Sequence, residues 1–166
     1  MFQKKEDIYR ISGEALAQLG SVDLLINNAS YLGATPLRLL ADTDCEDFAQ
    51  VLETNVLGPF RLTKAILPSM LLQKHGTVLN ISSDAAINPY PKWGAYGTSK
   101  AALAHLTRIW SEELREHGVR FVALDPGDMN TPMHAAAIPD SDPTQLSDPH
   151  TAALRLLDLI SKEGVS

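Results

Sequence analysis

The stretch that decides the fold is Ser82-Ser83 followed by Tyr96-Gly97-Thr98-Ser99-Lys100. Tyr96 and Lys100 are four residues apart at the start of an apolar-periodic run, 101–114, so on a helix they share one face. An ammonium beside a phenol favours the phenolate, which is expected to lower the pKa of Tyr96 towards neutrality. Ser83 follows a β-type run and is positioned to present its hydroxyl to the same point. The pattern predicts a site that transfers a proton to or from a carbonyl or alcohol oxygen.

Three further motifs stand in order around this stretch. A Tyr-x-x-x-Lys pair alone is a weak signal, because such pairs occur by chance on exposed helix faces. The further motifs are Asn27-Asn28-Ala29-Ser30 after an apolar run, Asn55 within 53–58, and Pro126-Gly127-Asp128-Met129-Asn130-Thr131 after a β-type run. The ordered set resembles the short-chain dehydrogenase/reductase family, and the resemblance covers nearly the whole chain.

The rest of the chain alternates between strand and helix patterns. Near-continuous apolar runs predict strands at 22–27, 77–82 and 119–124, as expected for strands buried on both faces. The predicted helices are an N-terminal one within 1–19, a long one over 45–73 capped by Thr43 or Asp44, and others near 97–117 and 151–161. Gly58-Pro59 is expected to bend or divide the long helix. This is an α/β pattern with a parallel sheet and helices on both faces.

The resemblance implies a Rossmann-like, three-layer, doubly wound sheet, but an incomplete one with about three strands evident. The ten glycines contain no Gly-x-Gly pair, which is the element that admits a cofactor pyrophosphate. We therefore expect residues 1–166 to form a single partial domain, the catalytic half, truncated at the N-terminus and at the C-terminus. A mis-assigned start codon, a disrupted gene and a short natural product remain alternatives. Residues 133–149 are predicted to be a substrate lid.

Composition excludes several classes of function. A formal net charge of −6 argues against a nucleic-acid partner, whose phosphates need a basic face. No apolar run approaches the ~20 residues of a membrane span, and no signal-peptide pattern opens the chain, so a cytoplasmic location is expected. Cys45 is the only cysteine and the five histidines are scattered, so neither an internal disulfide nor a metal site is expected.

The resemblance assigns catalytic roles to four residues. Tyr96 is the general acid/base, and Lys100 lowers its pKa and binds the nicotinamide ribose. Ser83 holds the substrate oxygen; Ser82 competes for this role, but strand alternation is expected to turn the two hydroxyls to opposite faces. Asn55, a poor helix former, distorts its helix and holds a water that links Lys100 to solvent.

The same resemblance implies a nicotinamide cofactor, either NAD or NADP. The residues expected to bind it are Asn28, Ala29, Tyr96, Lys100, Pro126, Gly127, Met129 and Thr131. The loop after the first strand borders the adenosine ribose, and the Pro-Gly turn runs under the nicotinamide. The residues that distinguish NAD from NADP follow a strand outside this sequence.

Two positions depart from the family pattern, and three others are candidates for the substrate pocket. Ser30 and Ala86 stand where glycines are usual, and Ala86 is expected to narrow the pocket slightly. Tyr90, Trp93 and Met133 are predicted to form pocket walls.

The implied activity is hydride transfer between an NAD(P) cofactor and a small carbonyl compound or secondary alcohol. A homo-oligomer, dimer or tetramer, is expected through the long helices, whose apolar residues include Leu57, Phe60, Leu103, Ile109 and Trp110. The alternative is a catalytically silent remnant or a non-catalytic subunit that docks on a full-length relative through the same helices.

Overall fold

Three parallel strands form the centre of the molecule. The computed structural model describes residues 5–162, and its sheet has the order β1-β2-β3, with Leu24 beside Thr77 and Val78 beside Phe121. The strands are β1 (Leu24–Asn27), β2 (Gly76–Ile81) and β3 (Val119–Leu124). The α-helices are α1 (Lys5–Leu19), α2 (Cys45–Leu52), α3 (Gly58–Gln73), α4 (Gly94–Glu113), α5 (Pro132–Ala137) and α6 (Pro149–Lys162). Short 3-10 turns occur at Leu40–Asp42, Asp84–Ala86 and Pro143–Gln145.

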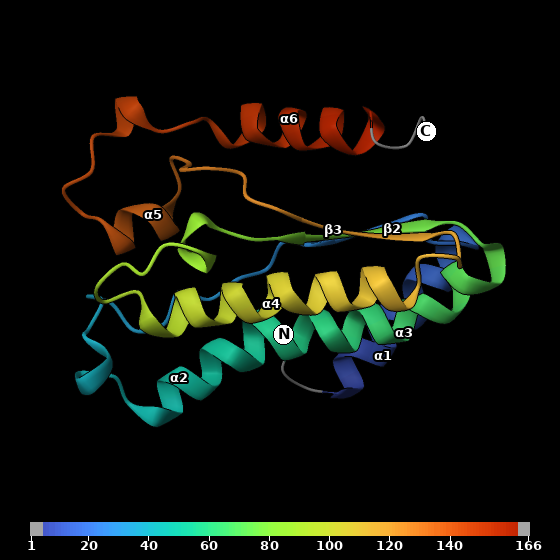
Figure 1. Ribbon diagram of the computed structural model, residues 1–166, viewed down its shortest axis with the longest axis horizontal. Coiled ribbons are helices and arrows are strands. Elements are labelled where there is room, and N and C mark those ends of the chain that lie inside the picture. Colours follow the sequence, from blue (N-terminus) through green and yellow to red (C-terminus); the bar gives the residue numbers. More distant parts are fainter. Residues whose placement is uncertain (1–4, 163–166) are drawn as a thin grey trace.

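Helices cover both faces of the sheet. Helices α1, α3 and α4 lie on one side and α6 lies on the other (Figure 1). This arrangement confirms the predicted α/β class with a doubly wound parallel sheet of three strands. Three strand boundaries differ from the prediction: β1 begins at Leu24, and β2 begins at Gly76 and ends at Ile81. Ser82 and Ser83 therefore lie just beyond β2, although the N–H of Ser82 still bonds to the carbonyl of Leu124 in β3.

The long predicted helix is divided by a π-helical turn, Glu53–Leu57. The division comes just before Gly58-Pro59, and its physical cause is Pro59. Proline has no N–H, so residue 59 cannot donate an α-helical hydrogen bond to the carbonyl of Asn55. The N–H of Gly58 bonds to the carbonyl of Glu53, five residues back, in place of the four-residue bond of an α-helix. Asn55 therefore occupies a widened turn at the junction of two helices.

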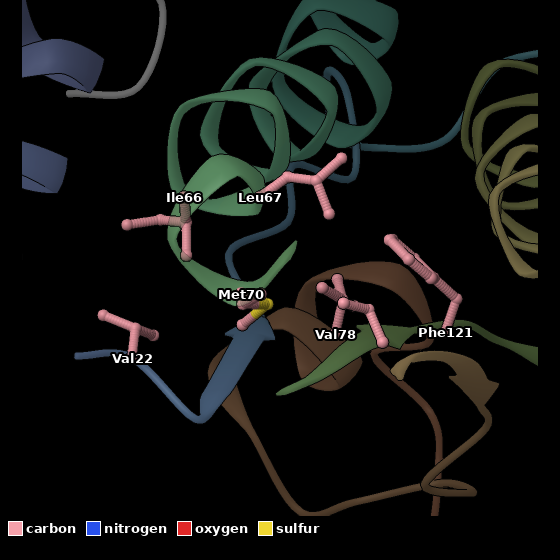
Figure 2. Packing of buried hydrophobic residues seen from close by; sticks show 7 residues of the cluster. Val22, Ile66, Leu67, Met70, Val78 and Phe121 are labelled. Atoms are coloured by element: carbon pink, nitrogen blue, oxygen red, sulfur yellow. The ribbon is translucent and has the colours of Figure 1, made fainter. Parts of the chain in front are cut away.

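The main core lies between the sheet and α3. Figure 2 shows Ile66, Leu67 and Met70 of α3 facing Val78 of β2 and Phe121 of β3. Met70 and Val78 are fully buried. Trp110 of α4 extends this core, because its ring stacks on Phe121 with centroids 5.6 Å apart. Trp110, one of the residues considered for an oligomer interface, thus packs within its own chain.

A buried polar network ties the sheet to two helices. Asn27 and Asn80 are neighbours in the β1–β2 register, and Nδ2 of Asn27 donates to the side-chain Oδ1 of Asn80 at 2.8 Å. The Asn27 amide also contacts Thr63 of α3 at 3.3 Å, and the Asn80 amide donates to Thr107 of α4 at 2.8 Å. Because each amide finds partners, the network fixes both helices against the sheet without leaving unpaired polar groups.

Candidate active site

A cavity of about 910 Å³ opens at the carboxyl ends of the three strands. Ligands of open α/β sheets bind at this edge. Its walls come from the loops after β1, β2 and β3, from the first turns of α4, and from α5, which lies at the same end of the sheet (Figure 1). Residues from two of the three further motifs, at 28–30 and 126–131, and from the Ser–Tyr–Lys stretch thus reach one space.

Tyr96 lies in the first turn of α4, with 9% of its surface exposed. The neighbouring Gly97 allows α4 to approach the turn after β2 closely: a Cβ on this glycine would lie 2.9 Å from the carbonyl oxygen of Ala85. Trp93 packs edge-on against the Tyr96 ring, with centroids 5.7 Å apart. Both aromatic side chains line the cavity.

The expected lowering of the Tyr96 pKa is wrong for the chain without cofactor. Burial of the phenol raises its pKa, and hydrogen bonding to Ser30 and Ser83 opposes this only in part. The Lys100 ammonium lies 5.4 Å from the centre of the Tyr96 ring. The Lys100 Nζ donates to the carbonyl oxygen of Ile81 at 2.7 Å, so the ammonium group lies at the carboxyl end of β2.

Lys100 is itself strongly perturbed. Burial lowers its pKa to about 8, although the carboxylate of Asp125 acts in the opposite direction. The side chain is 2% exposed and lines the cavity. It is a buried ammonium held by one carbonyl, with two N–H groups left to bond elsewhere.

Ser83 caps the short turn after β2. Its Oγ accepts from the N–H of Ala85 at 3.2 Å and donates to Asp84 Oδ1 at 3.1 Å. Ser82 also lines the cavity, and the expected turning of the two hydroxyls to opposite faces stays a prediction. Ser83 is the one in contact with the phenol of Tyr96.

Asn55 is 1% exposed and does not line the cavity. Its Oδ1 accepts from the N–H of Tyr31 at 2.7 Å and from Ser30 Oγ at 3.3 Å. Its Nδ2 donates to the carbonyl of Tyr31 and to Ser99 Oγ, at 2.8 and 2.9 Å. The amide is therefore fully occupied, and it joins the loop after β1 to α4.

Ser99 was missed by sequence reasoning. Its hydroxyl is completely buried, donates to the carbonyl of Tyr96 at 2.6 Å and accepts from Asn55. The available signal was a small polar residue one helical turn after Tyr96, on the side that faces the protein.

The residues predicted to bind the cofactor meet at the same cavity. All eight line it: Asn28, Ala29, Tyr96, Lys100, Pro126, Gly127, Met129 and Thr131. Gly127 has φ 75°, and its N–H donates to Asp125 Oδ1 at 2.9 Å. Such a left-handed turn favours glycine. The hydroxyl of Thr131 accepts from the N–H of His134 at 3.2 Å and so caps α5.

The predicted pocket walls Tyr90, Trp93 and Met133 also line the cavity, as does Ser30. Ala86 does not, so it cannot narrow the pocket as expected. Further lining residues were not foreseen: Asp84, Asp125, Asp128 and His134.

Within the described residues, 5–162, two kinds of feature are absent. No helix there is long and apolar enough to cross a bilayer. No group of three His, Cys, Asp or Glu side chains there is arranged to hold a metal ion.

Fold and cavity together define a doubly wound α/β protein with a cavity at the carboxyl edge of its sheet. Comparison with known sequences identifies the family: the model described as short chain dehydrogenase matches residues 2–142. The chain belongs to the short-chain dehydrogenase family.

Several relatives show the extent of the similarity. A 2-(R)-hydroxypropyl-CoM dehydrogenase of Xanthobacter autotrophicus is 37% identical over 127 residues, which are 76% of this chain and 51% of that protein. A solved NAD⁺-bound xylitol dehydrogenase matches with TM-score 0.74 and 34% identity, over 78% of this chain and 49% of the other. A short chain dehydrogenase of Escherichia coli CFT073 in complex with NADPH matches with TM-score 0.82 and 28% identity, over 89% and 60%. The chain spans about half the length of the curated relatives it matches.

Proposed function

We propose that the chain carries the acid/base centre of an NAD(P)-dependent oxidoreductase acting on a carbonyl compound or secondary alcohol. The supporting observation is that Tyr96, Ser83 and Lys100 line one cavity together with the loop 126–131. A nicotinamide cofactor, when bound, supplies or accepts the hydride. The residues of this chain hold the reacting oxygen and move its proton.

The cavity suits the nicotinamide and ribose part of such a cofactor. Two N–H groups of Lys100 remain for ribose hydroxyls, and Gly127 places no side chain in the turn. The carboxylates of Asp125 and Asp128 suit the positive charge of an oxidised nicotinamide ring. The neighbours solved with NAD⁺ and with NADPH support a nicotinamide cofactor of either form.

In the reductive direction, the phenol of Tyr96 donates its proton to the substrate oxygen, which Ser83 holds by a hydrogen bond. In the oxidative direction, the phenolate removes the hydroxyl proton. The raised pKa of Tyr96 keeps the phenol protonated in the absence of cofactor, which suits the acid role.

We also propose that Asn55 acts through its main chain. Because Pro59 offers no N–H and the Asn55 amide is fully bonded, the carbonyl of Asn55 is the atom available to hold a water. Such a water would connect Lys100 to solvent for proton exchange.

Residues 133–149 are proposed as a substrate lid. Met133, His134 and Ile138 line the cavity, and Ser147 is hydrogen bonded to the loop at Asp128 and Asn130. The buried Nε2 of His134 has no hydrogen-bond partner among the described residues, so a ligand or a lid movement would satisfy it.

Self-association through α3 and α4 is also proposed. Leu57 and Ile109 are 41% and 42% exposed, whereas Leu103 is buried within the chain. Sedimentation equilibrium of the wild type and of Ile109→Glu tests this, and a monomeric wild type would contradict it.

The test of the catalytic proposal is Tyr96→Phe. Removal of the proton donor is expected to lower kcat by about 10²–10⁴-fold while circular dichroism stays unchanged. The matched control is Tyr90→Phe, which removes a phenol from the cavity wall but not from the acid/base position. Retention of most of the turnover in Tyr96→Phe would contradict the proposal. Absence of hydride transfer and of NADH or NADPH binding by the folded wild type would favour a non-catalytic chain.

A further inference from the structure

The charged side chains along the cavity are mostly acidic. Asp84, Asp125 and Asp128 line it, whereas Lys100 is the one lysine or arginine among the described lining residues. The Lys100 ammonium is almost fully buried and bonded to the carbonyl of Ile81. His134, the other group able to carry a positive charge, faces Asp128, with Nδ1 and Oδ1 3.8 Å apart. Because the two remaining N–H groups of Lys100 are assigned to the ribose hydroxyls of the proposed cofactor, no cation among these described lining residues is left to bind an anionic substituent of the substrate.

Asp84 is the carboxylate that contacts Ser83: it follows Ser83 in the chain and accepts from its hydroxyl. The phenol of Tyr90 donates to the second oxygen, Oδ2, at 2.7 Å. This hydrogen bond lowers the pKa of Asp84, so the carboxylate is ionised at neutral pH. The carboxylate also accepts from the backbone of Ala85 and the side chain of Asn88, and the Asp84 side chain is exposed at the cavity.

We infer that the substrate is a neutral or cationic carbonyl or alcohol compound, and that Asp84 determines this specificity. Its carboxylate accepts hydrogen bonds from hydroxyl or ammonium groups next to the reacting carbon. The same carboxylate repels carboxylate, sulfonate and phosphate groups. The inference rests on the proposed function and adds the charge class of its substrate.

One test measures the charge of the cavity without turnover. Trp93 lines the cavity, whereas the other tryptophan, Trp110, is stacked in the core on Phe121. The fluorescence of Trp93 is quenched with caesium or with iodide at equal ionic strength, and the two efficiencies are compared. The signal of Trp93 is isolated by using Trp110→Phe, or by subtracting the signal of Trp93→Phe from that of the wild type. Caesium is expected to quench several-fold more efficiently, and Asp84→Asn is expected to reduce this ratio.

Two controls separate the local charge from the net charge of the chain. Asp42→Asn changes the net charge equally but lies outside the cavity lining, and Tyr90→Phe keeps the carboxylate. Both variants are expected to retain the wild-type ratio. Equal quenching by the two ions, or the same reduction in Asp42→Asn as in Asp84→Asn, would overturn the inference.

A second test uses turnover of a matched pair, 4-oxopentanoate and its methyl ester, with NADH or NADPH. The neutral ester is expected to have a kcat/KM at least ten-fold higher than the anion, and Asp84→Asn is expected to reduce this preference several-fold. Equal use of both compounds, or preference for the anion, would overturn the inference. Absence of turnover with either compound bears on the proposed function instead, and the quenching ratio then decides the charge of the cavity by itself.

Discussion

At the scale of single residues, the protonation of Lys100 couples the site to the stability of the chain. Its pKa falls from 10.5 to about 8 on burial, so folding disfavours the ammonium form. Between these two values the unfolded chain binds more protons than the folded one. Stability from this residue therefore rises as the pH rises from about 8 towards 10.5, and below pH 8 the full penalty is present.

This predicts a pH-dependent difference between the wild type and Lys100→Met. The wild type is expected to gain on the order of 2 kcal/mol relative to the variant between pH 7 and pH 10, because only the wild type has the buried ammonium. Urea unfolding at several pH values measures the difference, and the contributions of other titrating groups cancel. A difference that stays constant with pH would show that Lys100 titrates normally in the folded chain.

At the scale of elements, the close approach of α4 to the turn Asp84–Ala86 positions Tyr96 beside Ser83. The approach depends on Gly97, since a Cβ there would meet the backbone oxygen of Ala85 at 2.9 Å. Gly13 of α1 offers a matched comparison, because a Cβ there would have no atom within 4 Å. Both glycines lie within helices, so the helix propensity gained by alanine is similar.

We predict that Gly13→Ala raises the free energy of unfolding by about 0.5–1 kcal/mol, through helix propensity alone. Gly97→Ala is expected to lower it by about 1 kcal/mol, because the cost of moving a packed helix exceeds that gain. Thermal and urea unfolding measure both variants. A stabilised Gly97→Ala would mean that α4 can move away from the turn without cost.

At the scale of the whole molecule, stability depends on the core between α3 and the sheet. Met70 is fully buried there and lies beside Val78 and Phe121 (Figure 2). Leu72, two residues further along α3, is 87% exposed. The two side chains are both apolar and similar in size. Replacing each with alanine therefore compares the loss of a buried side chain with the loss of an exposed one.

Met70→Ala is expected to cost about 2–5 kcal/mol, since it leaves a cavity in the core. Leu72→Ala is expected to change the free energy of unfolding by less than about 0.5 kcal/mol. Urea titrations followed by circular dichroism measure both. Similar losses in the two variants would indicate that Leu72 is covered in solution, as it would be in an oligomer.

The sequence by itself determined the α/β class, the three parallel strands and the meeting of Ser83, Tyr96 and Lys100. These features depend on local patterns: buried strands appear as apolar runs, and a four-residue spacing places two side chains on one helix face. The motif residues at 28–29 and 126–131 also follow strand ends, and parallel strands bring their carboxyl ends to one edge.

Only the tertiary structure decided the environment of these groups. The direction of the Tyr96 pKa depends on how deeply packing buries the phenol, and no residue spacing expresses that. The bonds of Asn55 to Tyr31 and Ser99 join three segments far apart in the chain. The acidic lining of the cavity likewise combines loops from β2 and β3. Burial and charge at a site are sums over neighbours in space, which only the folded chain defines.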